Sequence, residues 1–167
     1  MTKENAKEAA DSITSSFSKL SRDEKIELLA SIVFSLKEGL SNTIPISVFD
    51  NDRLSTFEAV AKYMKEVLKL RFVDIGSSLN RSDKTIWVTY SKARKKMPSA
   101  FSSLVSDINV PIANLSDRKF TIFESLVLYL KDKDFTNHQV ASMLRRDDRT
   151  IWSEYDRAKK KRGVKAQ

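Results

Sequence analysis

The chain has 167 residues, of which 30 are Lys or Arg and 22 are Asp or Glu, so its formal net charge is +8. The absence of cysteine excludes disulfides, thiolate metal sites and cysteine nucleophiles. The sequence also holds no glycine-rich phosphate loop and no apolar run of the roughly 18 residues that a membrane span needs. With only three Gly and three Pro, the composition favours an all-α fold. We expect a cytoplasmic protein without metal, cofactor, membrane or small-molecule ligand, whose basic surface binds a polyanion.

The N-terminal segment, residues 1–43, is predicted to form a helical hairpin. Its second helix opens at a capping box, in which Ser21 precedes Glu24 by three residues, and extends to about Gly39. Two helices bury little apolar surface by themselves, so the hairpin needs to contact either the first repeat defined below or a second copy of the chain. Its apolar positions at helical spacing are Ala9, Ile13, Phe17, Leu20, Ile26, Leu29, Ile32, Val33 and Leu36.

The rest of the chain contains an internal repeat. Between residues 75–96 and 140–161, 11 of 22 positions are identical, and the two tryptophans of the chain, Trp87 and Trp152, are in register. Chance similarity would rarely align both. The predicted domains are a first repeat at 44–98, a second repeat at 110–161, a linker near 99–109 and a basic tail at 162–167.

The two repeats also match upstream, once one residue is deleted. Leu54 pairs with Phe120, and both precede a run of similar residues. Each repeat begins with an aliphatic residue followed by proline, at 44–46 and 110–112, which indicates an extended arm. A repeat of roughly 50 residues is long enough for three short helices.

A capping box is predicted to open the first helix of each repeat. Ser55 precedes Glu58 by three residues, and Thr121 precedes Glu124 by three residues. The hydroxyl can accept from the third N–H of the helix while the carboxylate accepts from the N–H of the cap. Apolar residues follow at helical spacing in both repeats and predict a buried face.

The second helix of each repeat is predicted to be short. In the second repeat Thr136 and Gln139 form another capping box, whereas Arg71 stands at the place of Thr136 in the first repeat and leaves the helix start less defined. The small residues Gly76 and Ala141 occupy equivalent positions, which suits a close approach between helices.

The third helix of each repeat follows a tight turn. Ser82 and Asp147 are suitable N-caps, so we predict helices at 83–96 and 148–161. At about 100° per residue, the positions that share a core-facing side are Ile86, Tyr90, Ala93, Ile151, Tyr155 and Ala158.

A short helix, a three-residue turn and the pattern S/D-x-x-T-I-x-x-x-Y-x-x-A-x-K resemble the helix-turn-helix of sigma-factor region 4 and related tri-helical DNA-binding domains. Residues 82–86 and 147–151 carry the likeness, which covers about 50 residues twice and leaves out residues 1–43. The resemblance implies a tri-helical fold for each repeat and a recognition helix at 83–96 and 148–161. It does not imply binding to a polymerase.

The positive charge is concentrated in the repeats. Residues 44–99 carry 11 basic and 6 acidic side chains, residues 100–167 carry 13 and 9, and residues 1–43 carry 6 and 7. We therefore expect basic residues opposite the core to contact DNA, arginines in the turns to clamp its backbone, and the basic runs 94–96 and 159–162 to reach phosphates. The expected DNA-binding residues are Arg81, Lys84, Thr85, Val88, Ser91, Lys92, Lys95, Arg145, Arg146, Arg149, Thr150, Ser153, Arg157 and Lys160.

Four other residues of the third helices bear on this interpretation. Trp87 and Trp152 lie at the boundary between the core-facing and exposed sides, where we expect them to pack in the core or at a hinge in preference to the alternative, insertion into DNA as wedges. Val88 either touches a thymine methyl group or is simply an exposed valine. Asp156 repels phosphate unless it accepts from a cytosine amino group.

The sequence predicts a double-stranded DNA-binding protein, in the first place a transcriptional regulator, with both third helices in the major groove. The order of the repeats suggests two unlike half-sites in one orientation. Two alternatives stay open: a nucleoid-associated architectural protein that coats DNA, and an adaptor whose repeats bind another protein. We expect no enzyme, because no nucleophile–base set is placed in a plausible site. We expect self-association through residues 1–43, since dimerisation commonly raises the affinity of small DNA-binding proteins.

Overall fold

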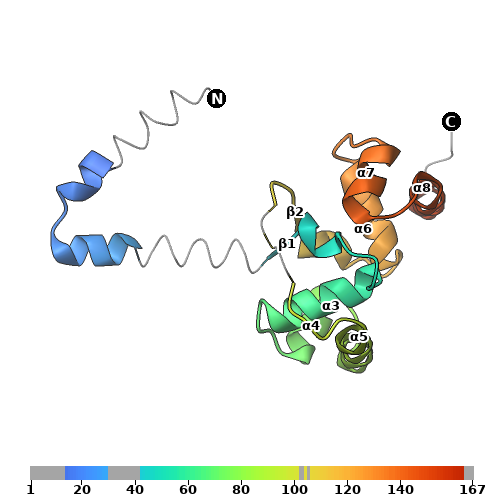
Figure 1. Cartoon of the computed structure of the whole chain (residues 1–167), viewed down its shortest axis with the longest axis horizontal. Coiled ribbons are helices and arrows are strands. Elements are labelled where there is room, and N and C mark those ends of the chain that lie inside the picture. Colours follow the sequence, from blue (N-terminus) through green and yellow to red (C-terminus); the bar gives the residue numbers. More distant parts are fainter. Residues whose placement is uncertain (1–13, 30–41, 102–103, 105, 164–167) are drawn as a thin grey trace. The chain divides into compact units, whose positions relative to one another are not determined.

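The computed structural model describes residues 14–29, 42–101, 104 and 106–163. The chain divides into two compact units, Met1–Ser41 and Asn42–Gln167, and both repeats fall within the second, which we call the body. Most of the described residues are helical, which confirms the all-α class (Figure 1). Within these ranges a two-stranded sheet of three-residue strands is the one departure, and no helix is long and apolar enough to cross a membrane.

The described part of the N-terminal unit is helical at residues 14–18 and 22–29. The predicted capping box is present: the N–H of Ser21 donates to Glu24 Oε2 at 2.8 Å, and the N–H of Glu24 donates to Ser21 Oγ at 3.3 Å. The remainder of the predicted hairpin, and residues 164–167 of the predicted basic tail, lie outside the described residues.

Both repeats have the same order of elements, a short strand, a 3-10 helix and three α-helices, so the three predicted helices of each repeat are confirmed. The first repeat contains β1 (Thr43–Pro45), η1 (Ile46–Phe49), α3 (Thr56–Glu66), α4 (Phe72–Leu79) and α5 (Asp83–Lys96). The second repeat contains β2 (Asn109–Pro111), η2 (Ile112–Leu115), α6 (Ile122–Lys131), α7 (Asn137–Leu144) and α8 (Asp148–Arg162).

The helices begin at the predicted caps. Complete capping boxes open α3, α6 and α7, and the side chains of Ser82 and Asp147 accept from the N–H groups three residues on at the starts of α5 and α8. At the start of α4, Arg71 offers no hydroxyl cap, and Asp74 takes the role that Glu58 has in α3. Its carboxylate accepts from the backbone N–H of Arg71 at 3.3 Å and from the Arg71 guanidinium at 2.8 Å.

The turn between the second and third helices is tight in both repeats. Asn80 and Arg145, at equivalent positions, adopt the left-handed conformation with φ of 52° and 47°. A Cβ atom at Gly76 would lie 2.7 Å from the carbonyl oxygen of Arg81, so a larger residue there would require the turn to shift away from α4. This agrees with the small residue predicted at this place.

The two repeats share one hydrophobic core. Ile86 and Ile151, on the inner sides of α5 and α8, are fully buried and belong to the same cluster of apolar side chains. Ile44 and Val110, from the two strands, are buried in it as well. The repeats are therefore packed together and are not two independent domains on a flexible linker.

Candidate nucleic-acid interface

The repeats are related by an approximate two-fold rotation. Strand β1 pairs antiparallel with β2 and places Ile44 opposite Val110, two residues that occupy the same position in their repeats. The flanking bonds obey the same symmetry, since the N–H of Ile46 donates to Ile108 O and the N–H of Ile112 donates to Asn42 O, both at 2.9 Å. When equivalent residues of two antiparallel strands face each other, a two-fold axis passes between them.

Two arginines of the turns join the repeats in the same reciprocal way. Arg81 donates to the carbonyl oxygen of Phe120 at 3.1 Å, and Arg146 donates to the carbonyl oxygen of Leu54 at 3.1 Å. Both arginines are half-buried, and burial together with the charge of Arg118 lowers the pKa of Arg81. We therefore assign Arg81 and Arg146 to the junction between the repeats, and the expectation that they also contact the backbone of DNA stays a prediction.

The third arginine of the turns keeps a more exposed position. Arg145 forms an ion pair with Asp50 of the first repeat, and both side chains are more than half exposed. Exposed ion pairs contribute little to stability, so this arginine is available to another anion at small cost.

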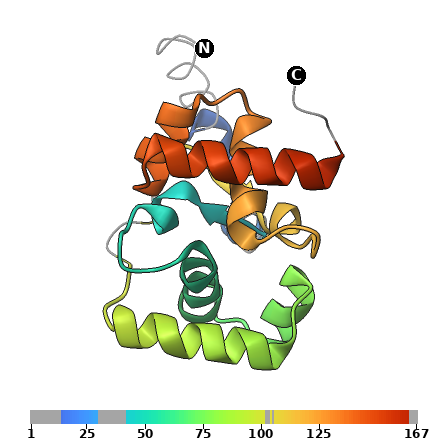
Figure 2. The ribbon, with the colours of Figure 1, turned by 90° about the vertical axis from the view of Figure 1, so that its right-hand side faces the viewer.

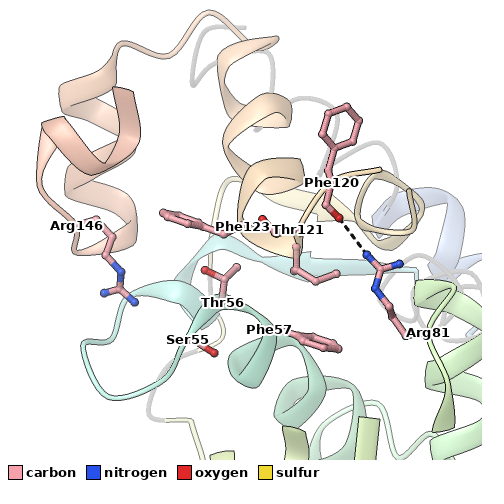
Figure 3. A pocket seen from close by; sticks show the side chains of 9 residues that line it. Ser55, Thr56, Phe57, Arg81, Phe120, Thr121, Phe123 and Arg146 are labelled. Carbon is pink, nitrogen blue, oxygen red and sulfur yellow. Dashed lines mark hydrogen bonds between the residues drawn. The ribbon is translucent and has the colours of Figure 1, made fainter. Parts of the chain in front are cut away.

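A hollow lies between the repeats and has a nearly symmetric lining (Figure 3). Phe57 from α3 and Phe123 from α6 are equivalent residues, as are Arg81 and Arg146. The hydrogen bond from Arg81 to Phe120 crosses one side of the hollow. The hollow is thus part of the two-fold interface.

Helices α5 and α8 lie on one face of the body. In Figure 2 both cross the side turned toward the viewer, α8 near the top and α5 near the bottom, and they run in opposite directions. This opposite sense is what the two-fold relation requires. The third helices of the two repeats therefore present a single surface with two antiparallel elements.

The exposed side of α5 carries unpaired positive charge. Lys84, Lys92 and Lys95 are exposed, and no ion pair to any of them is formed among the described residues. Val88 is 37% exposed between them, which fits its predicted outward direction. Ser91 is half-buried, and Thr85 is exposed with its hydroxyl 2.7 Å from Ser82 Oγ.

The exposed side of α8 is closer to neutral. Arg157 pairs with Glu154 at 2.6 Å, and Lys160 pairs with Asp156 at 2.7 Å, whereas Arg149 is exposed and forms no ion pair within the described residues. Asp156 is thus balanced by a lysine one turn along the helix.

The two hydroxyl residues expected to contact DNA from α8 are both half-buried. Ser153 Oγ donates to the carbonyl oxygen of Thr150, and Thr150 Oγ1 donates to Asp147, both at 3.0 Å. The second repeat consequently offers fewer free donors and cations than the first.

The two tryptophans are exposed, so the expectation that they pack in the core or at a hinge is wrong. Trp87 is 56% exposed and Trp152 is 59% exposed. Each follows the buried isoleucine of its helix by one residue, and a rotation of about 100° carries the side chain away from the first two helices. Their shared register was the signal for a surface role, because nothing in the packing of either repeat needs so large a side chain there.

The last lysines of the basic runs have a structural partner. Lys96 donates to Glu58 at 2.8 Å, and Lys161 donates to Glu124 at 2.7 Å. Burial alone raises the pKa of these two carboxyl groups, but the lysine and the N–H groups of the capping box outweigh it, so each pKa lies below its ordinary value. These lysines hold the end of the third helix against the start of the first.

Comparison of the chain with protein-family models, curated proteins and solved structures gives no match. Function is therefore inferred from the geometry and charge of α5 and α8.

Proposed function

We propose that the body binds double-stranded DNA and that α5 and α8 are the recognition helices of two helix-turn-helix units. The observation that carries the proposal is the placement of both helices on one face, with Lys84, Lys92 and Lys95 exposed and unpaired on α5. Cations that neutralise phosphates release condensed counterions, which favours binding to a duplex.

The dimensions of α5 suit a major groove. Its 14 residues span about 21 Å, and the groove is wide enough to admit an α-helix. Lys84 and Val88 stand near the start of the helix, where side chains of recognition helices reach base edges. Lys92 and Lys95 are further along the helix and exposed, which supports contact with phosphate oxygens. Transcriptional regulation is the role that such a reader would serve.

A second candidate function is supported by the exposed apolar side chains. Trp87 and Val88 are neighbours on α5, and Val73 on α4 is 51% exposed. Large apolar groups on a surface commonly mark contacts with another protein. In this alternative the repeats are an adaptor, and the lysines provide solubility.

The test is the binding of the full chain to a labelled duplex of about 30 base pairs, three turns of DNA, at low salt, measured by fluorescence anisotropy. We expect binding, and a loss of about tenfold or more when Lys84, Lys92 and Lys95 are replaced by Ala. The matched control removes three exposed charges outside α5 and α8, through Lys19→Ala, Arg22→Ala and Lys133→Ala.

The outcomes separate the candidates. No binding by the unaltered chain favours the adaptor. If the triple variant and the control lose affinity for the duplex equally, net charge alone attracts DNA. Selection of bound fragments from random duplexes then distinguishes a specific reader from an architectural protein, for which the specificity ratio is small.

A further inference from the structure

We infer that the body is a dimer of helix-turn-helix units within one chain and recognises an inverted repeat of two unlike half-sites. The inference rests on the proposed function and specifies the DNA that this function requires. It replaces the expectation of two half-sites in one orientation, which followed from the order of the repeats along the chain alone.

The polarity of the half-sites follows from the two-fold relation. The pairing of Ile44 with Val110 and the reciprocal bonds of Arg81 and Arg146 relate one repeat to the other by a half-turn. Helices α5 and α8 accordingly run in opposite directions across one face (Figure 2). A half-site is read in the direction of its recognition helix, so two half-sites read by helices related in this way are inverted.

The orientation of the repeats is fixed by packing. Ile44 and Val110 are fully buried at the strand pair, and apolar residues of both repeats form one core. To bind a direct repeat, one repeat of the body would have to rotate by 180° relative to the other. This rotation would break the β1–β2 pairing and both arginine contacts. The body is therefore unable to adapt to a direct repeat in the way that domains on a flexible tether can.

The half-sites differ because the exposed sides of the helices differ. Val88 of α5 is replaced by Ser153 in α8, and Ser91 is replaced by Asp156. A valine favours a thymine methyl group, and a carboxylate accepts from a cytosine amino group. The preferred DNA is thus an imperfect palindrome.

The first experiment selects bound fragments from random duplexes with the full chain and then compares synthetic duplexes by anisotropy. They carry the two selected half-sites inverted, in direct orientation, or singly. We expect the inverted arrangement to bind about a hundredfold more tightly than a single half-site, and the direct arrangement to bind like a single half-site. Insertion of about 5 base pairs, half a helical turn, between the inverted half-sites should remove the gain.

The second experiment makes the two helices more alike. The variant Ser153→Val with Asp156→Ser gives α8 the residues of α5 at the two positions compared above, while every buried residue is kept. We expect it to select a more symmetric palindrome, in which the second half-site becomes more similar to that of the first repeat.

The results distinguish a failure of the inference from a failure of the proposed function. If no duplex binds, the proposed function fails and the inference with it. If duplexes bind but direct repeats or single half-sites are preferred, DNA binding stands and the inference is overturned. If the variant selects two copies in direct orientation, the inference is likewise overturned.

Discussion

Arg81 donates a hydrogen bond to the carbonyl oxygen of Phe120, 39 residues away in the sequence, and this bond joins the turn of the first repeat to the second repeat. The equivalent bond, from Arg146 to Leu54, joins them in the opposite direction. The turn that precedes α5 thus has a side chain that faces the other repeat, so this turn contributes both to the start of α5 and to the packing of the repeats.

We expect Arg81→Ala to lower the free energy of unfolding by roughly 1–3 kcal/mol, because it leaves a partly buried carbonyl oxygen without its donor. Arg146→Ala should have a similar effect. Arg149→Ala is the control, since that side chain is exposed and forms no ion pair within the described residues. Urea unfolding followed by circular dichroism measures the difference. Equal stabilities of Arg81→Ala and the control would show that the contact does not hold the repeats together.

If α5 and α8 bind DNA as proposed, the contributions of the two helices should differ in their dependence on salt. Replacement of Lys84, Lys92 and Lys95 by Ala should reduce the slope of log affinity against log salt by about 0.9 for each phosphate that the variant no longer neutralises. Replacement of Arg149, Arg157 and Lys160 should reduce it less, because two of these cations are already paired with acids of α8. A larger effect in the second repeat would contradict this assignment. Titrations at several salt concentrations provide the slopes.

The exposed tryptophans should contribute little to stability. Trp87→Phe should change the free energy of unfolding by no more than about 0.5 kcal/mol, as surface substitutions usually do. The adjacent Ile86→Ala, at a fully buried position, should cost roughly 2–5 kcal/mol. Urea unfolding of the two variants compares the loss of stability at an exposed residue with that at its buried neighbour. Comparable destabilisation by the two substitutions would place Trp87 in the core after all.

Stability should decline in acid through the two capping glutamates. The pKa of Glu58 and of Glu124 is lowered in the folded chain from an ordinary value of 4.5, so their contribution is complete above that pH and is lost as the pH falls through the lower folded value. The variant Glu58→Gln with Glu124→Gln should be less stable at neutral pH and lose less on acidification. Urea unfolding between pH 7 and pH 3 tests this. Parallel pH profiles for the variant and the unaltered chain would exclude these two groups as the cause.

We expect the full chain to self-associate through its N-terminal unit, where Ile26 and Leu29 are 57% and 50% exposed. The double variant Ile26→Glu with Leu29→Glu should then be monomeric by light scattering. Arg22→Glu, on the same helix, is a control for the added negative charge. A monomeric unaltered chain would disprove the expectation.

Local chemistry made the helices predictable from the sequence. Ser55, Thr121 and Ser82 satisfy helix N–H groups within three residues of themselves, so their pattern is informative without any tertiary structure. The burial of Ile86 and Ile151 follows from spacing in the same way.

The relation between the repeats was not predictable by such means. The order of two repeats along a chain does not determine whether they are related by translation or rotation, and only the pairing of β1 with β2 decides it. The roles of Arg81 and Arg146 depend on that relation, because their acceptors belong to the opposite repeat. Trp87 and Trp152 were misplaced because a boundary position on a helix suits either side.

The pairing of β1 with β2 also bears on how such a chain could arise. For each hydrogen bond that the first repeat donates to the second, the second repeat donates an equivalent bond to the first, both at the strands and at the arginines. One repeat alone would therefore have an unpaired strand and an arginine without its acceptor. Two identical copies would satisfy each other through the same contacts. The present chain has the form that duplication and fusion of a symmetric ancestor would produce, and once the halves were joined, each was free to change its exposed residues without altering the other.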